Sequence, residues 1–167
     1  TVLTAEHCLD GGGTGWFQLE KTPASQADIY HSTKVVLHQN LDIAVMMLGD
    51  QPVDRSDPAN PSPLKPMPIV TAGQKPAVGM EVTLIGFGRT DENLPSDSLK
   101  RLGTNKITTV YGDMFWFWGL SNLCFGDSGG PSTTLVFGAE RVIGVHSVKA
   151  GVCGTGGADA RVDLAFT

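Results

Sequence analysis

The amino-acid sequence predicts an all-β protein, either a sandwich or a barrel, and two observations carry this prediction. Helical periodicity is hard to find in the chain, whereas short runs of β-branched or apolar residues recur along its length. Clusters of glycine, proline, asparagine and aspartate separate these runs, as they do where short strands alternate with turns.

The expected strands begin at the N-terminus, where Val2 and Leu3 read as part of a buried strand. Among the later segments, the aromatic sequence MFWFWG at 114–119 can pack in a strand or core, or it can line a substrate cleft. The pattern favours packing. The longest apolar run is much shorter than the roughly 18 residues needed to span a bilayer. The remaining expected strands lie at residues 34–37, 43–48, 81–87, 106–110, 135–137, 142–145 and 160–164.

A proline-rich segment divides the chain. Residues 51–68 hold six of the ten prolines, a content that fits neither a helix nor a central strand. We therefore predict a first unit over residues 1–60, a semi-extended linker over 61–68 and a second unit over 69–167.

Charge and cysteine content limit the possible partners. The 167 residues carry a formal net charge of −5 without a basic patch, so we expect a monomer with no nucleic-acid partner and no membrane partner. The three cysteines are an odd number, and Cys8 stands apart from Cys124 and Cys153. Because the chain also starts within a run that reads as a strand, we expect a fragment in which Cys8 has lost an upstream partner.

The stretch CFGDSGGP, at 124–131, is the strongest functional candidate. Gly126, Gly129 and Gly130 surround Ser128, and they let the backbone adopt positive φ angles and approach another molecule closely. On its own the stretch also fits an ordinary tight turn, because glycine, aspartate, serine and proline are common turn residues.

Two upstream residues could activate Ser128. A serine is a strong nucleophile only when a base takes its proton and a third group orients that base. His7 lies in LTAEHC, and Asp42 lies in LDIAVMML just before the most apolar run of the chain. Taken singly, the histidine reads as a structural neighbour of Cys8 and the aspartate as a turn residue. Together the three occur in the order His, Asp, Ser, which is the chymotrypsin order.

A rival interpretation starts from the same stretch, which also fits Gly-x-Ser-x-Gly, the nucleophile turn of α/β-hydrolases. That fold needs an acid and then a histidine after the serine, whereas here His146 precedes Asp159 and Asp163. The chain also lacks the alternation of strands and helices that builds a parallel sheet. The order of residues therefore rejects this alternative.

The whole chain resembles the trypsin/chymotrypsin-like serine endopeptidases. The resemblance rests on TAEHC, LDIAVMML, GFG at 86–88, GDSGGP, GVHS at 144–147 and the closing ARV. It implies two antiparallel six-stranded Greek-key β-barrels with the active site between them, the N-terminal barrel being incomplete here. The compact loops and few cysteines are similar to those of bacterial members.

The resemblance also implies a role for each matching residue. Ser128 would be the nucleophile, His7 the general base and then acid, and Asp42 the group that fixes the imidazole tautomer. The backbone N–H groups of Gly126 and Ser128 would form the oxyanion hole, and Asp127 would receive the N-terminal ammonium created by zymogen cleavage. The resemblance thus implies a secreted endopeptidase that forms an acyl-enzyme with protein or peptide substrates and needs no cofactor. The alternative is a catalytically silent protease-like binding protein, whose mark would be a lost triad member.

The substrate pocket is predicted from the same resemblance, including a disulfide between Cys124 and Cys153 that ties its walls. P1 denotes the substrate residue on the N-terminal side of the cleaved bond. Asn122, at the expected pocket base, carries no charge and therefore disfavours arginine or lysine at P1. His146 and Lys149 favour an acidic P1 residue, whereas an apolar P1 residue is expected if His146 only packs and Lys149 points to solvent. The other expected pocket residues are Leu123, Ser147 and Gly157.

No metal is predicted. No cluster of carboxylates like a calcium loop stands between His7 and Asp42.

Overall fold

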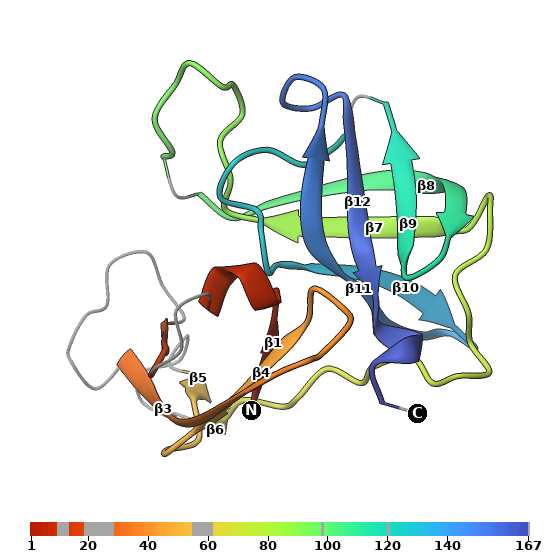
Figure 1. The fold of residues 1–167 in the computed structure, drawn as a ribbon. Helices are drawn as coiled ribbons and strands as arrows, with labels where there is room; N and C mark the ends of the chain where they lie inside the picture. The colour runs from red at the N-terminus through yellow and green to blue at the C-terminus, as the bar shows by residue number, and fades with distance from the viewer. Residues whose placement is uncertain (10–13, 19–28, 55–61, 98, 120, 167) are drawn as a thin grey trace.

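The structure is a computed structural model that describes residues 1–9, 14–18, 29–54, 62–97, 99–119 and 121–166 (Figure 1). The described residues form antiparallel strands in two main sheets, joined by loops and short 3₁₀ helices. The prediction of an all-β fold is confirmed. None of the helices in these ranges is long and apolar enough to cross a membrane.

The first sheet is a curled, four-stranded sheet with the order β1-β4-β3-β2. Its strands are all antiparallel to their neighbours. The predicted strands at Val2 and at 43–48 correspond to β1 and β4, whereas β2 was not predicted because its apolar part, Trp16 and Phe17, is too short to form a run. The strand bounds are β1 Val2–Thr4, β2 Trp16–Gln18, β3 Ile29–Leu37 and β4 Ala44–Leu48.

The second sheet closes into a six-stranded barrel in the order β10-β11-β12-β9-β8-β7. Closure satisfies the backbone hydrogen bonds of every strand, so no strand is left as an exposed edge. In Figure 1 the barrel lies above and to the right of the first sheet. The bounds are β7 Glu81–Gly86, β8 Arg101–Tyr111, β9 Met114–Trp118, β10 Pro131–Val136, β11 Ala139–Ala150 and β12 Gly156–Arg161.

The strand β9 contains the aromatic run and confirms that it packs in the barrel. Phe115 and Phe117 are fully buried, while Trp118 is half exposed. This alternation is the two-residue period of a strand with one face in the core. The run does not line the cavity beside Ser128.

The last predicted strand, at 160–164, is placed too late in the chain. The strand β12 ends at Arg161, and Val162–Leu164 form the 3₁₀ helix η3. The prediction missed the start of β12 because glycines carry no apolar signal. Here they are required, since a Cβ on Gly156 would collide with the Trp118 ring and one on Gly157 would lie 2.7 Å from Asn122 Oδ1.

The proline-rich segment contributes one short strand pair, β5 (Val53–Asp54) with β6 (Ser62–Pro63). Residues 55–61 of this segment lie outside the described residues. Beyond β6 the chain reaches the barrel, where Val70 N donates to Val142 O at 2.9 Å. The division into units 1–60 and 69–167 with a linker at 61–68 stays a prediction.

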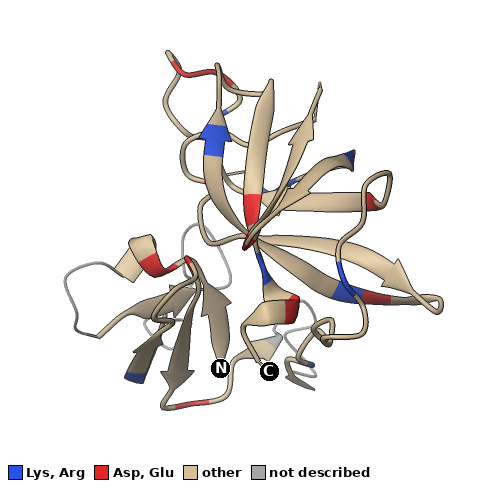
Figure 2. Cartoon of the chain, turned by 45° about the vertical axis from the view of Figure 1, so that its right-hand side comes forward, with Lys and Arg blue, Asp and Glu red and all other residues tan. Residues whose placement is uncertain are grey.

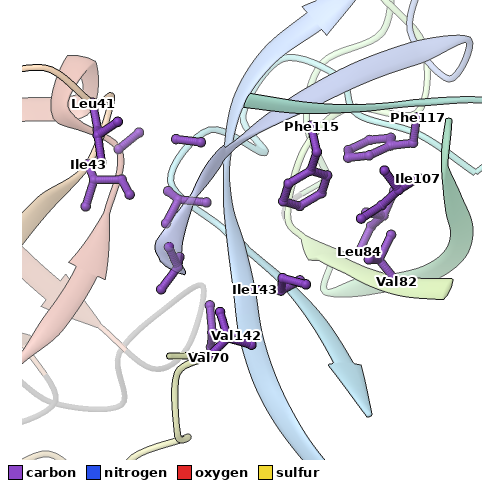
Figure 3. Close-up of a cluster of buried hydrophobic side chains, with 14 of the residues drawn as sticks. Leu41, Ile43, Val70, Val82, Leu84, Ile107, Phe115, Phe117, Val142 and Ile143 are labelled. Carbon is purple, nitrogen blue, oxygen red and sulfur yellow. The ribbon is translucent and has the colours of Figure 1, made fainter. Parts of the chain in front are cut away.

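A single cluster of buried side chains extends from the first sheet into the barrel (Figure 3). Leu41 and Ile43 belong to it on one side, and Ile143, Phe115 and Phe117 on the other. Each such side chain contributes roughly 1.5–3 kcal/mol through burial. The shared core fixes the loops that meet where the two sheets face each other.

Candidate active site

Asp42 and His7 lie side by side in connections of the first sheet. His7 lies in the 3₁₀ helix η1 (Glu6–Leu9) after β1, and Asp42 lies in the connection between β3 and β4. The neighbours of Asp42, Leu41 and Ile43, are both buried and anchor its backbone. Asp42 Oδ2 lies 2.7 Å from His7 Nδ1, and Oδ1 accepts a hydrogen bond of 2.9 Å from the His7 backbone N–H.

A third donor to Asp42 comes from the barrel. Ser147 Oγ on β11 donates to Asp42 Oδ2 at 2.5 Å. Burial raises the pKa of the Asp42 carboxyl, but the hydrogen bonds from Ser147 and from His7 outweigh burial and bring the pKa below its usual value of 3.8. The sequence placed Ser147 only in the pocket wall. Its contact with Asp42 spans 105 residues and leaves no local sequence pattern.

Ser128 lies in the loop between Cys124 and β10. Gly126 and Gly129 have φ angles of 94° and 79°, which side chains rarely adopt. A Cβ on Gly129 would also collide with the side chain of Thr4, so this glycine allows the loop to approach the first sheet. The glycines of the motif are therefore explained by backbone conformation and by close approach.

The backbone amides around Ser128 are divided into two groups. Asp127 N and Gly130 N donate to carbonyl oxygens of the same loop, and Gly129 N donates to His146 O on β11. The amides of Gly126 and Ser128 donate to no other described residue. These two amides are therefore free to bind an oxygen atom of a ligand.

His7 and Ser128 line the same cavity, of about 350 Å³. The structure contains no hydrogen bond between these two residues. Instead, the exposed Cys8 thiol lies 3.8 Å from His7 Nε2. Partial burial of the sulfur and the charge of Asp42 raise the pKa of Cys8, so the thiol stays protonated at neutral pH.

Asp127 lines this cavity too, but its carboxylate is held by backbone amides of the barrel and the preceding loop. Its carboxylate accepts hydrogen bonds from Gly88 N at 2.8 Å and Cys124 N at 2.9 Å. Any side chain at Gly86 or Gly88 would collide with it, which explains the GFG motif at 86–88. Asp127 also borders a second cavity, of about 310 Å³, on the other side of the loop.

The expected pocket residues do not all face one cavity. Leu123, His146, Ser147 and Lys149 line the cavity beside Ser128. Asn122 lines the second cavity, and its side chain bonds the backbone, with Nδ2 donating to Phe117 O at 3.2 Å and Oδ1 accepting from Leu123 N at 2.9 Å. Gly157 lies directly against the side chains of Asn122 and Leu123.

The two cationic candidates of the pocket both have acidic partners that the sequence analysis did not identify. Lys149 Nζ forms an ion pair with Glu92, and His146 Nδ1 lies 2.9 Å from Asp159 Oδ1. His146 and Asp159 are opposite each other in the pairing of β11 with β12. The one available signal for Asp159 was a charged residue between two alanines, directly before the strand predicted at 160–164, whereas Glu92 lies in a loop without pattern.

Burial and Asp159 act in opposite directions on the pKa of His146. Burial lowers the pKa of this imidazole, but the charge of Asp159 and its hydrogen bond outweigh burial and raise the pKa above the usual value of 6.5. The side chains of His146 and Asp159 are 1% and 0% exposed. The pair is therefore a buried ion pair at the wall shared by the two cavities.

The predicted disulfide between Cys124 and Cys153 is present and ties the loop before Ser128 to the connection between β11 and β12. Lysines, arginines and acidic residues are interspersed on several elements (Figure 2). No group of three or more histidine, cysteine or acidic residues in the described ranges could hold a metal. Residues 10–13 and 19–28 of the segment between His7 and Asp42 lie outside those ranges.

Comparison with known proteins identifies the family of the chain. The family model described as Trypsin matches residues 1–166. A relative, Trypsin eta of Drosophila erecta, is 29% identical over 152 residues, which cover 78% of this chain and 58% of the relative. The chain thus spans less than two thirds of that relative's length. Because the family model matches almost the entire length of this chain, the chain belongs to the trypsin family.

Proposed function

We infer that the chain carries the active site of a serine endopeptidase, with Ser128 as nucleophile, His7 as general base and then acid, and Asp42 as the group that orients the imidazole. The observation that carries this proposal is the bonding of Asp42. Its carboxylate binds the His7 ring and backbone at 2.7 Å and 2.9 Å, and this holds the ring beside the cavity that Ser128 also lines.

The proposed reaction begins when Ser128 Oγ attacks the carbonyl carbon of the scissile bond and His7 Nε2 takes the hydroxyl proton. Asp42 holds the proton on Nδ1 and stabilises the imidazolium ion. The free amides of Gly126 and Ser128 bind the oxyanion, and each such donor contributes about 3–4 kcal/mol to the transition state. His7 then protonates the leaving amine, and water hydrolyses the acyl-enzyme by the reverse proton transfers.

The wider setting of the reaction follows from the family and the disulfide. Trypsin-family proteases act on protein or peptide substrates, and a disulfide suits an oxidising compartment, so we place the enzyme outside the cell as a monomer without a cofactor. The second cavity beside Asp127 has room for the N-terminal ammonium of an activated chain.

The test is labelling of the full-length, activated protein with a fluorophosphonate, which modifies a serine only when a base activates it. We expect stoichiometric labelling at Ser128, hydrolysis of peptide substrates, and loss of both in the Ser128→Ala and His7→Ala variants. A folded, full-length protein that is neither labelled nor active would refute the proposal in favour of a catalytically silent binding protein.

The Ser147→Ala variant tests the third donor to Asp42. A hydrogen bond to a charged group contributes about 1.5 kcal/mol or more, so we expect kcat/KM to fall about tenfold. The matched control is Ser132→Ala in β10, where the buried hydroxyl has no partner among the described residues. Unchanged kcat/KM in Ser147→Ala, or an equal loss in both variants, would show that this bond does not support catalysis.

A further inference from the structure

The cavity beside Ser128 is lined by two cationic side chains, and each is matched by a carboxylate that does not line it. Lys149 is paired with Glu92, and His146 with Asp159. Asp127, a third charged group at this cavity, accepts two backbone hydrogen bonds. From sequence alone, His146 and Lys149 would make the pocket positive. With their acidic partners included, this wall of the cavity carries little net charge.

Lys149 is held in one place by several contacts. Its ammonium group pairs with Glu92, donates to Gly151 O at 2.6 Å and lies 4.8 Å from the centre of the Phe125 ring. Its side chain is 19% exposed, so it does not point freely into solvent. Phe125 lines the same cavity as Lys149, and the ammonium group lies against the face of its ring.

Glu92 is fixed independently of Lys149. Its carboxylate also accepts the backbone N–H of Cys153 at 3.2 Å, and Cys153 is bonded to Cys124, the neighbour of Phe125. The contacts therefore form a closed ring from Phe125 through Lys149, Glu92 and the disulfide. This ring holds the loop that follows β7 against the cavity wall.

We propose that Glu92 is a specificity-determining residue: by neutralising Lys149 it makes the cavity beside Ser128 accept an uncharged P1 side chain rather than an acidic one. The proposal rests on the proposed function, because it identifies this cavity as the P1 pocket of the peptidase. It rejects the acidic one of the two P1 preferences, acidic and apolar, that the sequence left open.

The experiment compares two peptide substrates of the full-length, activated enzyme that differ only in glutamate or glutamine at P1. The two residues have nearly the same shape, so the ratio of their kcat/KM values reports the charge preference of the pocket. We expect the parent to prefer glutamine. The Glu92→Gln variant, which keeps the acceptor for Cys153 N, should raise the Glu/Gln ratio by about tenfold.

Two further variants locate the cause of that shift. The double variant Glu92→Gln/Lys149→Gln should return to the Glu/Gln ratio of the parent, because the positive charge of Lys149, which Glu92→Gln leaves unpaired, is removed. Glu140→Gln is the matched control, since Glu140 accepts from Thr133 Oγ1 at the barrel wall, outside the Ser128 cavity. The increase in Glu92→Gln should also shrink at high salt, because ions screen charges that water reaches.

Binding to Ser128→Ala protein separates this proposal from the proposed function. Calorimetry with acetylated tetrapeptide amides that end in glutamate or glutamine measures the same preference without catalysis. If the parent does not hydrolyse peptides, the proposed catalytic function fails, while the binding ratio still decides the role of Glu92. The role is refuted if the parent prefers glutamate, if Glu92→Gln changes the ratio no more than Glu140→Gln, or if the increase survives loss of Lys149.

Discussion

Replacement of Asp42 by asparagine is expected to lower kcat by about 10⁴-fold, the size typical of replacing this carboxylate in a serine protease triad. Asp42 accepts hydrogen bonds from His7 Nδ1, the His7 backbone and Ser147. An asparagine amide would donate to Nδ1 in place of accepting from it. The proton would then reside on Nε2, the nitrogen that must take the proton of Ser128.

The measurement is kcat for one peptide substrate, with the free energy of unfolding measured in parallel. The matched control is Asp50→Asn, which makes the same change at an exposed position after β4. Because the pKa of Asp42 lies below 3.8, its charge persists at neutral pH, and the stability that it contributes is lost only as the pH falls through that lowered value. A folded Asp42→Asn enzyme that keeps a tenth of the parent kcat would contradict the triad assignment.

The sequence predicted those parts of the molecule that have a local pattern. Runs of β-branched residues gave most of the barrel strands, and the glycines around Ser128 pointed to a loop of special geometry. The first half of β12 escaped prediction because Gly156 and Gly157 are there to make room for Trp118 and Leu123. Only the folded structure shows which side chains need this space. A strand of small residues also lacks the alternation of apolar and polar residues by which a strand is predicted.

The direction of side chains in the site could not be predicted in the same way. Counting back from Ser128 placed Asn122 at the expected pocket base, but its amide bonds the backbone of Phe117 and Leu123. The ion pair of Lys149 with Glu92 depends on a loop 57 residues away. Such contacts depend on how separate loops pack. The sequence therefore predicts which residue types lie in the site, but it does not predict their hydrogen-bond and ion-pair partners.

Replacement of Asp159 by asparagine is expected to lower the free energy of unfolding by about 3–5 kcal/mol, the usual effect of breaking a buried ion pair. The imidazolium of His146 is 1% exposed and would lose the carboxylate that pairs with it among the described residues. Removing the charges of both Asp159 and His146 should lower the free energy of unfolding less than removing that of Asp159 alone. We therefore expect the Asp159→Asn/His146→Gln double variant to regain part of the lost stability.

Urea unfolding of the full-length protein across pH measures this effect, with Asp113→Asn as the control at an exposed turn of the same barrel. Asp159 raises the pKa of His146 above 6.5, so the folded state binds a proton more tightly than the unfolded state. The stabilisation by the pair is then complete below pH 6.5 and is lost as the pH rises through the raised pKa. The difference between the parent and Asp159→Asn should therefore be largest in acid and shrink in alkali. A loss that is the same at both ends of this range would show that Asp159 acts through packing and not through the charge of His146.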